Sequence, residues 1–123
     1  MKKLLLVCLL LVASFAQAGW VLVSEDDRGD IYIDPDTLQK NDAFRKIWQL
    51  QDLKVRDPYG EMSRRTWKEY ECGTGRTRIL MFVAHSSPMV EGKPISSGGA
   101  SGRWSDIAPR TADEATFRKV CAN

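Results

Sequence analysis

The sequence predicts an α+β domain: an antiparallel β-sheet of about six strands, with one C-terminal helix packed on it and disulfide-linked to it. Three observations support this prediction. Short runs of β-branched and aromatic residues, separated by turn residues, fill most of the chain after residue 18. Helical spacing occurs only after Pro109. Two cysteines stand in these segments, Cys72 at the end of a strand-like run and Cys121 in the helical one.

The N-terminal segment has the three parts of a secretory signal peptide. Two lysines follow the initiating methionine, residues 4–13 are apolar, and alanines two residues apart precede Gly19. The apolar run is shorter than the roughly 20 residues that cross a bilayer. We therefore expect a signal peptide at 1–18, cleaved between Ala18 and Gly19, and one domain at 19–123.

Cys8 does not have the surroundings of a lipid-anchored cysteine. It lies inside the apolar run with Val7 before it, whereas a lipoprotein signal has a small residue before its cysteine and a complete apolar region upstream. We therefore expect no stable membrane anchor and a periplasmic or secreted protein.

The formal charge of +2 resides in the predicted signal, on Lys2 and Lys3. Without these 18 residues the chain of 123 keeps 105, with 16 of its 18 basic residues against 16 acidic ones. A balanced charge predicts no polyanionic partner, and export makes nucleic acid an improbable target. This length is enough for one domain and too short for two.

Cys72 and Cys121 remain as an even pair in an oxidising compartment, which predicts a disulfide. The alternatives are two free thiols or a metal pair. A metal site needs further ligands, and the chain has one histidine, His85, and no Cys-x-x-Cys motif. The bond would close a loop of about 50 residues and stabilise the domain by about 4 kcal/mol.

Strands are expected at residues 20–24, 31–33, 43–53, 62–72, 76–86 and, at a sheet edge, 89–95. We expect Asp34-Pro35 to end the second strand, because proline cannot donate to a ladder. The run Ile79–Ala84 is apolar at every position, which is typical of a central strand covered on both faces. The composition of residues 96–102 predicts a flexible loop.

The only expected helix lies at the end of the chain. Thr111 and Glu114 have the spacing of a capping box, and Phe117, Val120 and Cys121 fall on one face. A helix of about ten residues is marginal alone. Docking on the sheet and the bond through Cys121 would stabilise it.

Strand parity assigns the two faces of the sheet. Cys72 shares parity with Tyr70 and Met62, so that face is expected to meet the helix, while Trp67 points the other way. One short helix cannot cover two faces. The second face is then closed by sheet curvature or by another subunit, and we favour self-association as a homodimer.

Five basic residues form the best candidate for a partner surface: Arg64, Arg65 and Lys68 on one strand, and Arg76 and Arg78 on its hairpin partner. They are expected to lie close together, with Trp67 and Tyr70 interleaved. Such a patch would hold a sulfated glycan or an acidic protein segment. The alternative, which we favour, is an ordinary solvated face neutralised by Glu69 and Glu71.

The stretch "SEDDRGDIYIDPD", residues 24–36, suggests two sharper functions. An Arg-Gly-Asp triplet at 28–30, in a predicted hairpin turn, could be presented to an integrin-type receptor, yet these residues are common in solvated turns. Its five aspartates (Asp26, Asp27, Asp30, Asp34 and Asp36) could bind calcium, but the order of an EF-hand loop and its closing glutamate are missing. We expect a solvated turn, with no metal or cofactor.

Catalysis has little support in the sequence. His85 is followed by Ser86 and Ser87, but neighbours on a strand point to opposite faces and do not form a catalytic pair. We expect His85 to end the central strand at the surface, and the protein to be no enzyme. A small hydrolase would need a pocket around His85.

Several segments, in this order, resemble the surface-adhesin protein E family: Trp20, "GDIYIDPDTL" at 29–38, Trp48, "EYEC" ending at Cys72, Arg78, Gly92, the Trp104, Ile107 and Pro109 of a W-x-x-I-x-P motif, and Val120-Cys121. The resemblance spans nearly all of residues 19–123. Short aromatic and glycine signatures are weak singly, and their joint spacing is moderately specific.

The resemblance implies a sheet of about six antiparallel strands with a disulfide-linked C-terminal helix. It also implies adhesin function, since the family is named for a bacterial surface lipoprotein that looks like a dimeric adhesin for host extracellular-matrix and plasma proteins. This chain departs from that pattern at the lipidation cysteine. We predict an exported, non-enzymatic binding domain that contacts protein or glycan partners through its sheet; the alternative is a periplasmic structural or envelope-stress accessory protein without a host ligand.

Overall fold

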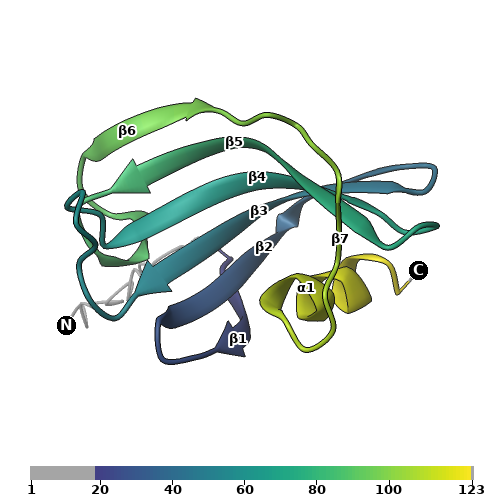
Figure 1. The fold of residues 1–123 in the computed structure, drawn as a ribbon, viewed down its shortest axis with the longest axis horizontal. Coiled ribbons are helices and arrows are strands. Elements are labelled where there is room, and N and C mark those ends of the chain that lie inside the picture. The colour runs from purple at the N-terminus through teal and green to yellow at the C-terminus, as the bar shows by residue number, and fades with distance from the viewer. Residues whose placement is uncertain (1–18, 123) are drawn as a thin grey trace, which may run out of the picture.

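The computed structural model describes residues 19–122, which form one antiparallel sheet and one α-helix (Figure 1). Six strands have the same order in the sheet as in the chain: β1 (Val21–Glu25), β2 (Gly29–Asn41), β3 (Phe44–Leu53), β4 (Ser63–Glu71), β5 (Arg76–His85) and β6 (Pro94–Gly99). A short strand, β7 (Ser105–Asp106), pairs with β5 and leads to helix α1 (Ala112–Val120). The predicted α+β class is confirmed.

The predicted signal peptide, 1–18, lies outside the described residues. Within the described part of the chain, no helix is long and apolar enough to span a bilayer.

Strand β2 continues through Pro35, so the prediction that Asp34-Pro35 ends the second strand is wrong. The pairing of β2 with β3 shifts register between Asp34 and Gln39. There the Thr37 hydroxyl donates to the Asp34 carbonyl at 2.7 Å and accepts from the Trp48 backbone N–H at 3.1 Å. A side chain thus satisfies the ladder at this irregularity, and the missing proline N–H does not end the strand.

Strand β5 lies between β4 and β6, but it is not covered on both faces as predicted. Val83 and Ala84 are buried, whereas Ile79 and Met81 are 41% and 38% exposed. The apolar run was misleading because each face of this strand is covered over only part of its length. An apolar side chain at a strand position does not by itself require a covering layer.

The chain after His85 also differs from prediction. A 3₁₀ turn, η1 (Pro88–Val90), replaces the start of the predicted edge strand, and β6 extends to Gly99 through residues predicted as loop. The open edge of β5 supplies the partners for β6. Position 98 favours glycine, because a Cβ atom there would lie only 3.3 Å from a ring carbon of Phe82.

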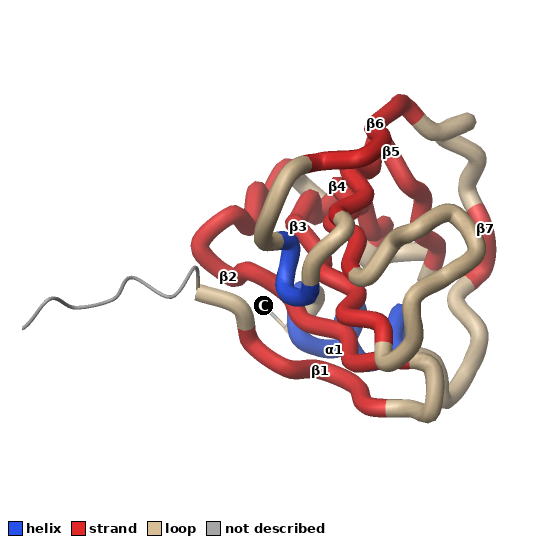
Figure 2. Tube along the Cα trace, turned by 90° about the vertical axis from the view of Figure 1, so that its left-hand side faces the viewer, coloured by secondary structure: helices blue, strands red, loops and turns tan. Residues whose placement is uncertain are grey.

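Helix α1 begins and docks as its sequence predicts. The Thr111 hydroxyl accepts the Glu114 backbone N–H at 3.3 Å. Val120 of the helix joins Ile33, Ile47 and Tyr70 in the core, with Phe117 and Cys121 packed against it. The helix lies nearest to β1 and β2 (Figure 2).

The disulfide between Cys72 and Cys121 joins the end of β4 to the last turn of the helix, with the two Cα atoms 5.6 Å apart. The predicted link between sheet and helix is therefore confirmed. Tyr70 faces the helix as predicted, since its hydroxyl donates to Asp113. We call this side of the sheet the helix face, and the opposite side, to which Trp67 points, the outer face.

Candidate functional site

The outer face carries a row of large apolar side chains across three strands. Trp48 of β3 lies opposite Trp67 of β4, which lies opposite Met81 of β5. The tryptophan ring centroids are 5.2 Å apart, in a tilted contact. Both tryptophans are half-buried and Met81 is exposed. We call Trp48, Trp67 and Met81 the outer row.

Arg65 extends the outer row toward the end of β4. Its guanidinium carbon lies 5.2 Å from the centroid of the Trp48 ring, which is the distance of a cation–π contact. Its Nε is buried and has no hydrogen-bond partner among the described residues. A partner that covers this face cannot reach Nε, but Nη1 and Nη2 make no described hydrogen bond and are open to such a partner.

A charged cluster borders the other side of the outer row. Arg78 forms an ion pair with Glu69 at 2.6 Å and stacks on the Trp104 ring at 4.4 Å. Arg76 pairs with Glu71 at 3.0 Å. The Thr74 hydroxyl and Arg76 lower the pKa of the Glu71 carboxyl, so this carboxylate stays charged at neutral pH.

Among the described residues, the turn η1 covers one end of the outer face, and Trp104 packs over the charged cluster at the other end. The backbone N–H of Val90 donates to the Ser63 hydroxyl, and that of Met89 donates to the Asp52 carboxylate, both at 2.8 Å. Beneath this turn, Leu50 and Ser63 are fully buried. The covering layer stops there, and the outer row beyond it stays partly open.

The five basic residues of the predicted patch are divided between the two faces. Arg64 and Lys68 lie on the helix face, and Arg65, Arg76 and Arg78 lie on the outer face. Four of the five pair with carboxylates: Arg64 with Glu61, Lys68 with Asp113, Arg76 with Glu71 and Arg78 with Glu69. The structure therefore brings together two smaller, largely neutralised sets. Whether either set binds a partner stays a prediction.

On the helix face, one carboxylate links the sheet to the helix. Asp113 Oδ1 accepts hydrogen bonds from Lys68 Nζ at 2.5 Å and from the Tyr70 hydroxyl at 3.0 Å. Burial of Tyr70, together with the negative charge of Asp113, raises the pKa of the phenol well above its usual value of 10.0. The phenol therefore stays protonated and serves as a structural donor.

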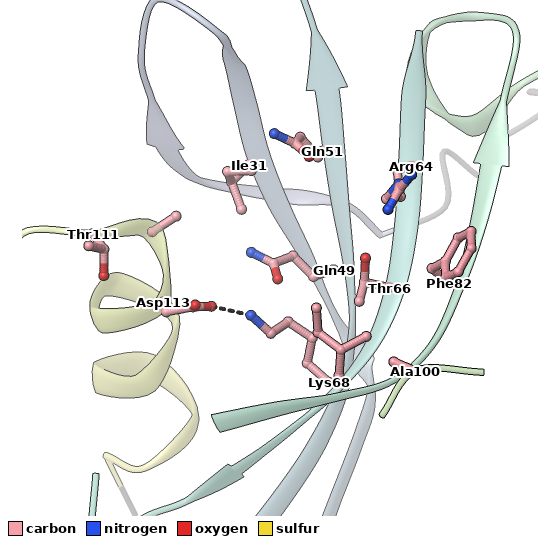
Figure 3. Close-up of a pocket in the computed structure, with 12 residues that line it drawn as sticks. Ile31, Gln49, Gln51, Arg64, Thr66, Lys68, Phe82, Ala100, Thr111 and Asp113 are labelled. Atoms are coloured by element: carbon pink, nitrogen blue, oxygen red, sulfur yellow. Dashed lines mark hydrogen bonds and ion pairs between the residues drawn. The ribbon is translucent and has the colours of Figure 1, made fainter. Parts of the chain in front are cut away.

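A cleft of about 480 Å³ opens on the helix face, between the start of α1 and strands β2 to β5 (Figure 3). Its polar lining includes Gln49, Gln51, Thr66 and Arg64, and its apolar lining includes Phe82. A volume of this size lies within the range of roughly 300–1,000 Å³ that is usual for small-molecule sites.

The Arg-Gly-Asp triplet is not presented at a loop tip, contrary to the predicted hairpin turn. Only Arg28 lies in the turn, because β2 begins at Gly29. Gly29 is buried, and a Cβ atom there would lie 2.2 Å from the Asp52 carbonyl oxygen. Asp30 pairs with Asp52 within the sheet. An integrin-type receptor would thus meet a strand and not an exposed tripeptide.

The aspartates of this stretch are used mainly by the backbone. Asp26 accepts the N–H groups of Arg28 and Gly29, which lowers the pKa of its carboxyl. Asp34 accepts the N–H of Asp36. Among the described residues, no group of three or more His, Cys, Asp or Glu side chains could hold a metal ion.

His85 is buried, so the prediction that it ends the strand at the surface is wrong. It is 5% exposed, and neither ring nitrogen has a hydrogen-bond partner among the described residues. The physical reason is the turn η1, which returns over the ends of β3, β4 and β5 directly after His85. A ring closed off in this way is poorly placed to act as a base on a substrate.

Sequence reasoning named Glu69 and Glu71, which pair with Arg78 and Arg76, but it missed the partners of Arg64 and Lys68 and the composition of the cleft. Asp113 reaches Lys68 only because the helix packs on the sheet. Glu61 reaches Arg64 through the turn that precedes β4. The cleft needs the register of β3 against β4, which no short motif shows. A signal was present for part of the outer row, since strand parity directs Trp67 away from the helix.

Residues 20–122 match the family described as surface-adhesin protein E. The fold is similar to that of solved structures of Haemophilus influenzae protein E. One, in crystal form II, has a TM-score of 0.64 at 13% identity, covering 86% of this chain and 89% of that one. Another, from a non-typeable strain, has a TM-score of 0.67 at 13% identity, covering 89% and 80%. No curated protein matches the chain.

Proposed function

Because the chain belongs to the surface-adhesin protein E family, we propose that it is an exported, non-enzymatic binding protein that contacts a protein partner through the outer face of its sheet. The outer row carries this proposal: Trp48, Trp67 and Met81 lie side by side on a face that residues 19–122 leave partly open. An adhesin-like role fits the family, and the host extracellular matrix is the partner class that follows from it.

The composition of this face favours a protein partner. Aromatic and arginine side chains at the centre of a patch dominate binding energies in protein interfaces. Here the outer row lies beside Arg65, whose guanidinium is held on the Trp48 ring. The surrounding ion pairs of Arg76 and Arg78 provide a polar rim.

A sulfated glycan is the weaker candidate for this face. Arg78 and Arg76 each have a carboxylate within 3.0 Å, so their positive charge is largely compensated. A polyanion gains most of its affinity from uncompensated positive charge. Only Arg65, of the outer-face cations in the predicted patch, lacks an ion pair among those the structure describes.

A second copy of the chain is the alternative occupant of the outer row, which would make a homodimer. An interface that buries the outer row on both copies would be symmetric and self-complementary. Light scattering tests this point: a concentration-dependent doubling of mass that Met81→Lys abolishes would assign the face to self-association. A monomer at all concentrations would indicate that the outer face binds a different partner.

The binding experiment compares two variants on purified extracellular-matrix proteins and on heparin, each immobilised for biolayer interferometry. Met81→Lys puts a charge into the outer row, and Val55→Lys puts the same charge on a loop residue that is 77% exposed. We expect Met81→Lys to weaken protein binding at least tenfold and Val55→Lys to leave it unchanged. Equal effects of the two variants, or binding to heparin alone, would contradict the proposal.

The place of the protein in the cell separates the adhesin role from the alternative, a periplasmic structural or envelope-stress accessory protein. We propose cleavage between Ala18 and Gly19, followed by release or display. Antibody labelling of intact cells should detect the protein if it is an adhesin. Labelling only after the outer envelope is opened would favour the accessory role, and mass spectrometry of the N-terminus would locate the cleavage.

A further inference from the structure

We propose that the cleft on the helix face is a binding site for a neutral oligosaccharide. The site is separate from the outer row and does not depend on the function proposed above. The two sites lie on opposite faces of the same sheet, so they can be tested independently.

A largely buried glutamine whose amide faces the cleft without a partner is the strongest sign of a ligand here. Gln49 is 8% exposed, and the structure describes no hydrogen bond made by its side chain. Figure 3 shows this amide reaching into the space between the helix and Thr66. The amide atoms themselves stay open to the cleft, so their hydrogen-bonding capacity is free for water or a ligand.

Two further polar groups lie in the same lining with unused capacity. Gln51 follows on the same strand and face, and Thr66 lies opposite Gln49 on β4. The structure describes no side-chain hydrogen bond for either residue. Two amides and a hydroxyl each offer donors as well as acceptors, which matches a row of sugar hydroxyls, since a hydroxyl also donates and accepts.

Arg64 supplies fixed donors without net charge. Its Nε and Nη2 donate to the two carboxylate oxygens of Glu61 at 2.5 and 3.0 Å, and its guanidinium carbon lies 4.6 Å from the Phe82 ring centroid. These contacts hold the planar guanidinium in one orientation. Its Nη1 is free of described partners and offers two N–H donors.

Lys68 and Asp113 give a second compensated pair at the other side of the cleft. The ammonium and the carboxylate are 2.5 Å apart, and the pair is tied to the core through the Tyr70 hydroxyl. Asp113 Oδ2 makes no described hydrogen bond, so it remains as an acceptor. The two cations of the lining are thus each paired with a carboxylate, Lys68 with Asp113 in the lining and Arg64 with Glu61 beside it.

This balance of charge decides between ligand classes. A sulfated or carboxylated sugar would gain little from cations that are already paired, and a purely apolar ligand would leave the amides unsatisfied. Apolar surfaces of Ile31, Ile79 and Ala100 alternate with the polar groups. A neutral sugar chain, with C–H faces and hydroxyl edges, satisfies both kinds of surface.

An extended peptide is the competing occupant, and it fits less well. Peptides that bind sheets gain affinity from main-chain bonds to an open strand edge. The cleft lies over the face of β2 to β5, whose backbone groups are used within the ladders. Only side chains are available here.

The test is an NMR titration of the ¹⁵N-labelled domain, residues 19–123, with tetrasaccharides of glucose and of N-acetylglucosamine in α- and β-linkage. We expect at least one to shift the side-chain amide signals of Gln49 and Gln51 with saturation, and with little dependence on salt. A heparin tetrasaccharide and a capped Gly-Ser hexapeptide are titrated in parallel. Shifts caused by either of these alone, or by no neutral tetrasaccharide at 10 mM, would overturn the proposal.

Two variants connect binding to the cleft. Thr66→Val keeps the shape of the side chain and removes its hydroxyl, and Gln51→Ala removes one amide; each is expected to weaken binding about five- to tenfold. Gln39→Ala is the matched control, because Gln39 is an exposed glutamine on β2 outside the cleft. Thermal melting verifies that each variant is folded. Unchanged affinity in both folded cleft variants would also overturn the proposal.

Discussion

Arg45 Nε donates a hydrogen bond to the carbonyl oxygen of Val120, at 3.1 Å and across 75 positions of the chain. Its Nη1 also donates to the carbonyls of Asp42 and Phe44. Arg45 is 9% exposed, so a strand residue inside the core satisfies one of the open carbonyls at the end of the helix. The positive charge also lies at the negative end of the helix dipole.

Replacing Arg45 by Met should therefore loosen the helix from the sheet. The variant keeps the apolar stem but leaves three carbonyl groups without this donor, and we expect a loss of about 2–3 kcal/mol in the free energy of unfolding. Arg45→Lys, which keeps one donor and the charge, should lose less. Urea unfolding followed by circular dichroism measures both, and equal stability of Arg45→Met and the wild type would contradict the role of this contact.

The disulfide should account for a large share of the domain's stability. Cys72 and Cys121 are 49 positions apart, and chain-entropy arguments give about 4 kcal/mol for a loop of this length. Small domains have a net stability of about 5–15 kcal/mol. We expect the double variant Cys72→Ser, Cys121→Ser to melt at a much lower temperature. Dithiothreitol should lower the wild-type melting temperature and leave that of the double variant unchanged.

The raised pKa of Tyr70 predicts that the domain loses stability in alkaline solution. Burial and the charge of Asp113 raise the pKa of the folded phenol well above 10.0, so the unfolded chain releases this proton first. The stabilising contribution is complete below about pH 10 and falls as the pH rises above it, by up to about 1.4 kcal/mol per pH unit.

Tyr70→Phe tests this origin of the pH dependence. The variant loses the hydrogen bond to Asp113 and should be less stable at pH 7, but its stability should fall less steeply between pH 10 and 11.5. Tyr59→Phe is the control, because Tyr59 is 88% exposed. Parallel curves for Tyr70→Phe and Tyr59→Phe in that interval would rule out the buried phenol as the cause.

The parts of the fold that were predictable depend on local chemistry. The turn after Cys72, the cap at Thr111 and the parity of Tyr70 and Trp67 each follow from a few neighbouring residues. The division of Arg64 and Arg65 between two faces also follows from parity alone, although the predicted patch placed them together. Local rules thus gave the sheet, the helix and their covalent link.

The remaining features depend on tertiary contacts. Residues 96–99 form a strand because the open edge of β5 lies beside them, not because of their composition. His85 is buried by η1, where Met89 and Val90 adopt positive φ angles of 57° and 51° that their side chains do not favour. The unpaired Gln49 amide is visible only after the register of β3 and the position of the helix are known.

Gly29 is the position in the acidic stretch where one added carbon should be most harmful. A Cβ atom would lie 2.2 Å from the Asp52 carbonyl oxygen and 3.1 Å from the Leu53 Cα, and both are backbone atoms of the neighbouring strand. Gly29→Ala must therefore push β2 away from β3, and we expect a loss of about 3 kcal/mol or more. Gly73→Ala is the control, because nothing lies within 4 Å of its added carbon and its φ is not positive. We expect the control to change stability by no more than about 0.5 kcal/mol. If chemical denaturation shows similar stability for the two variants, the close approach of β2 to Asp52 is not a constraint on this sequence.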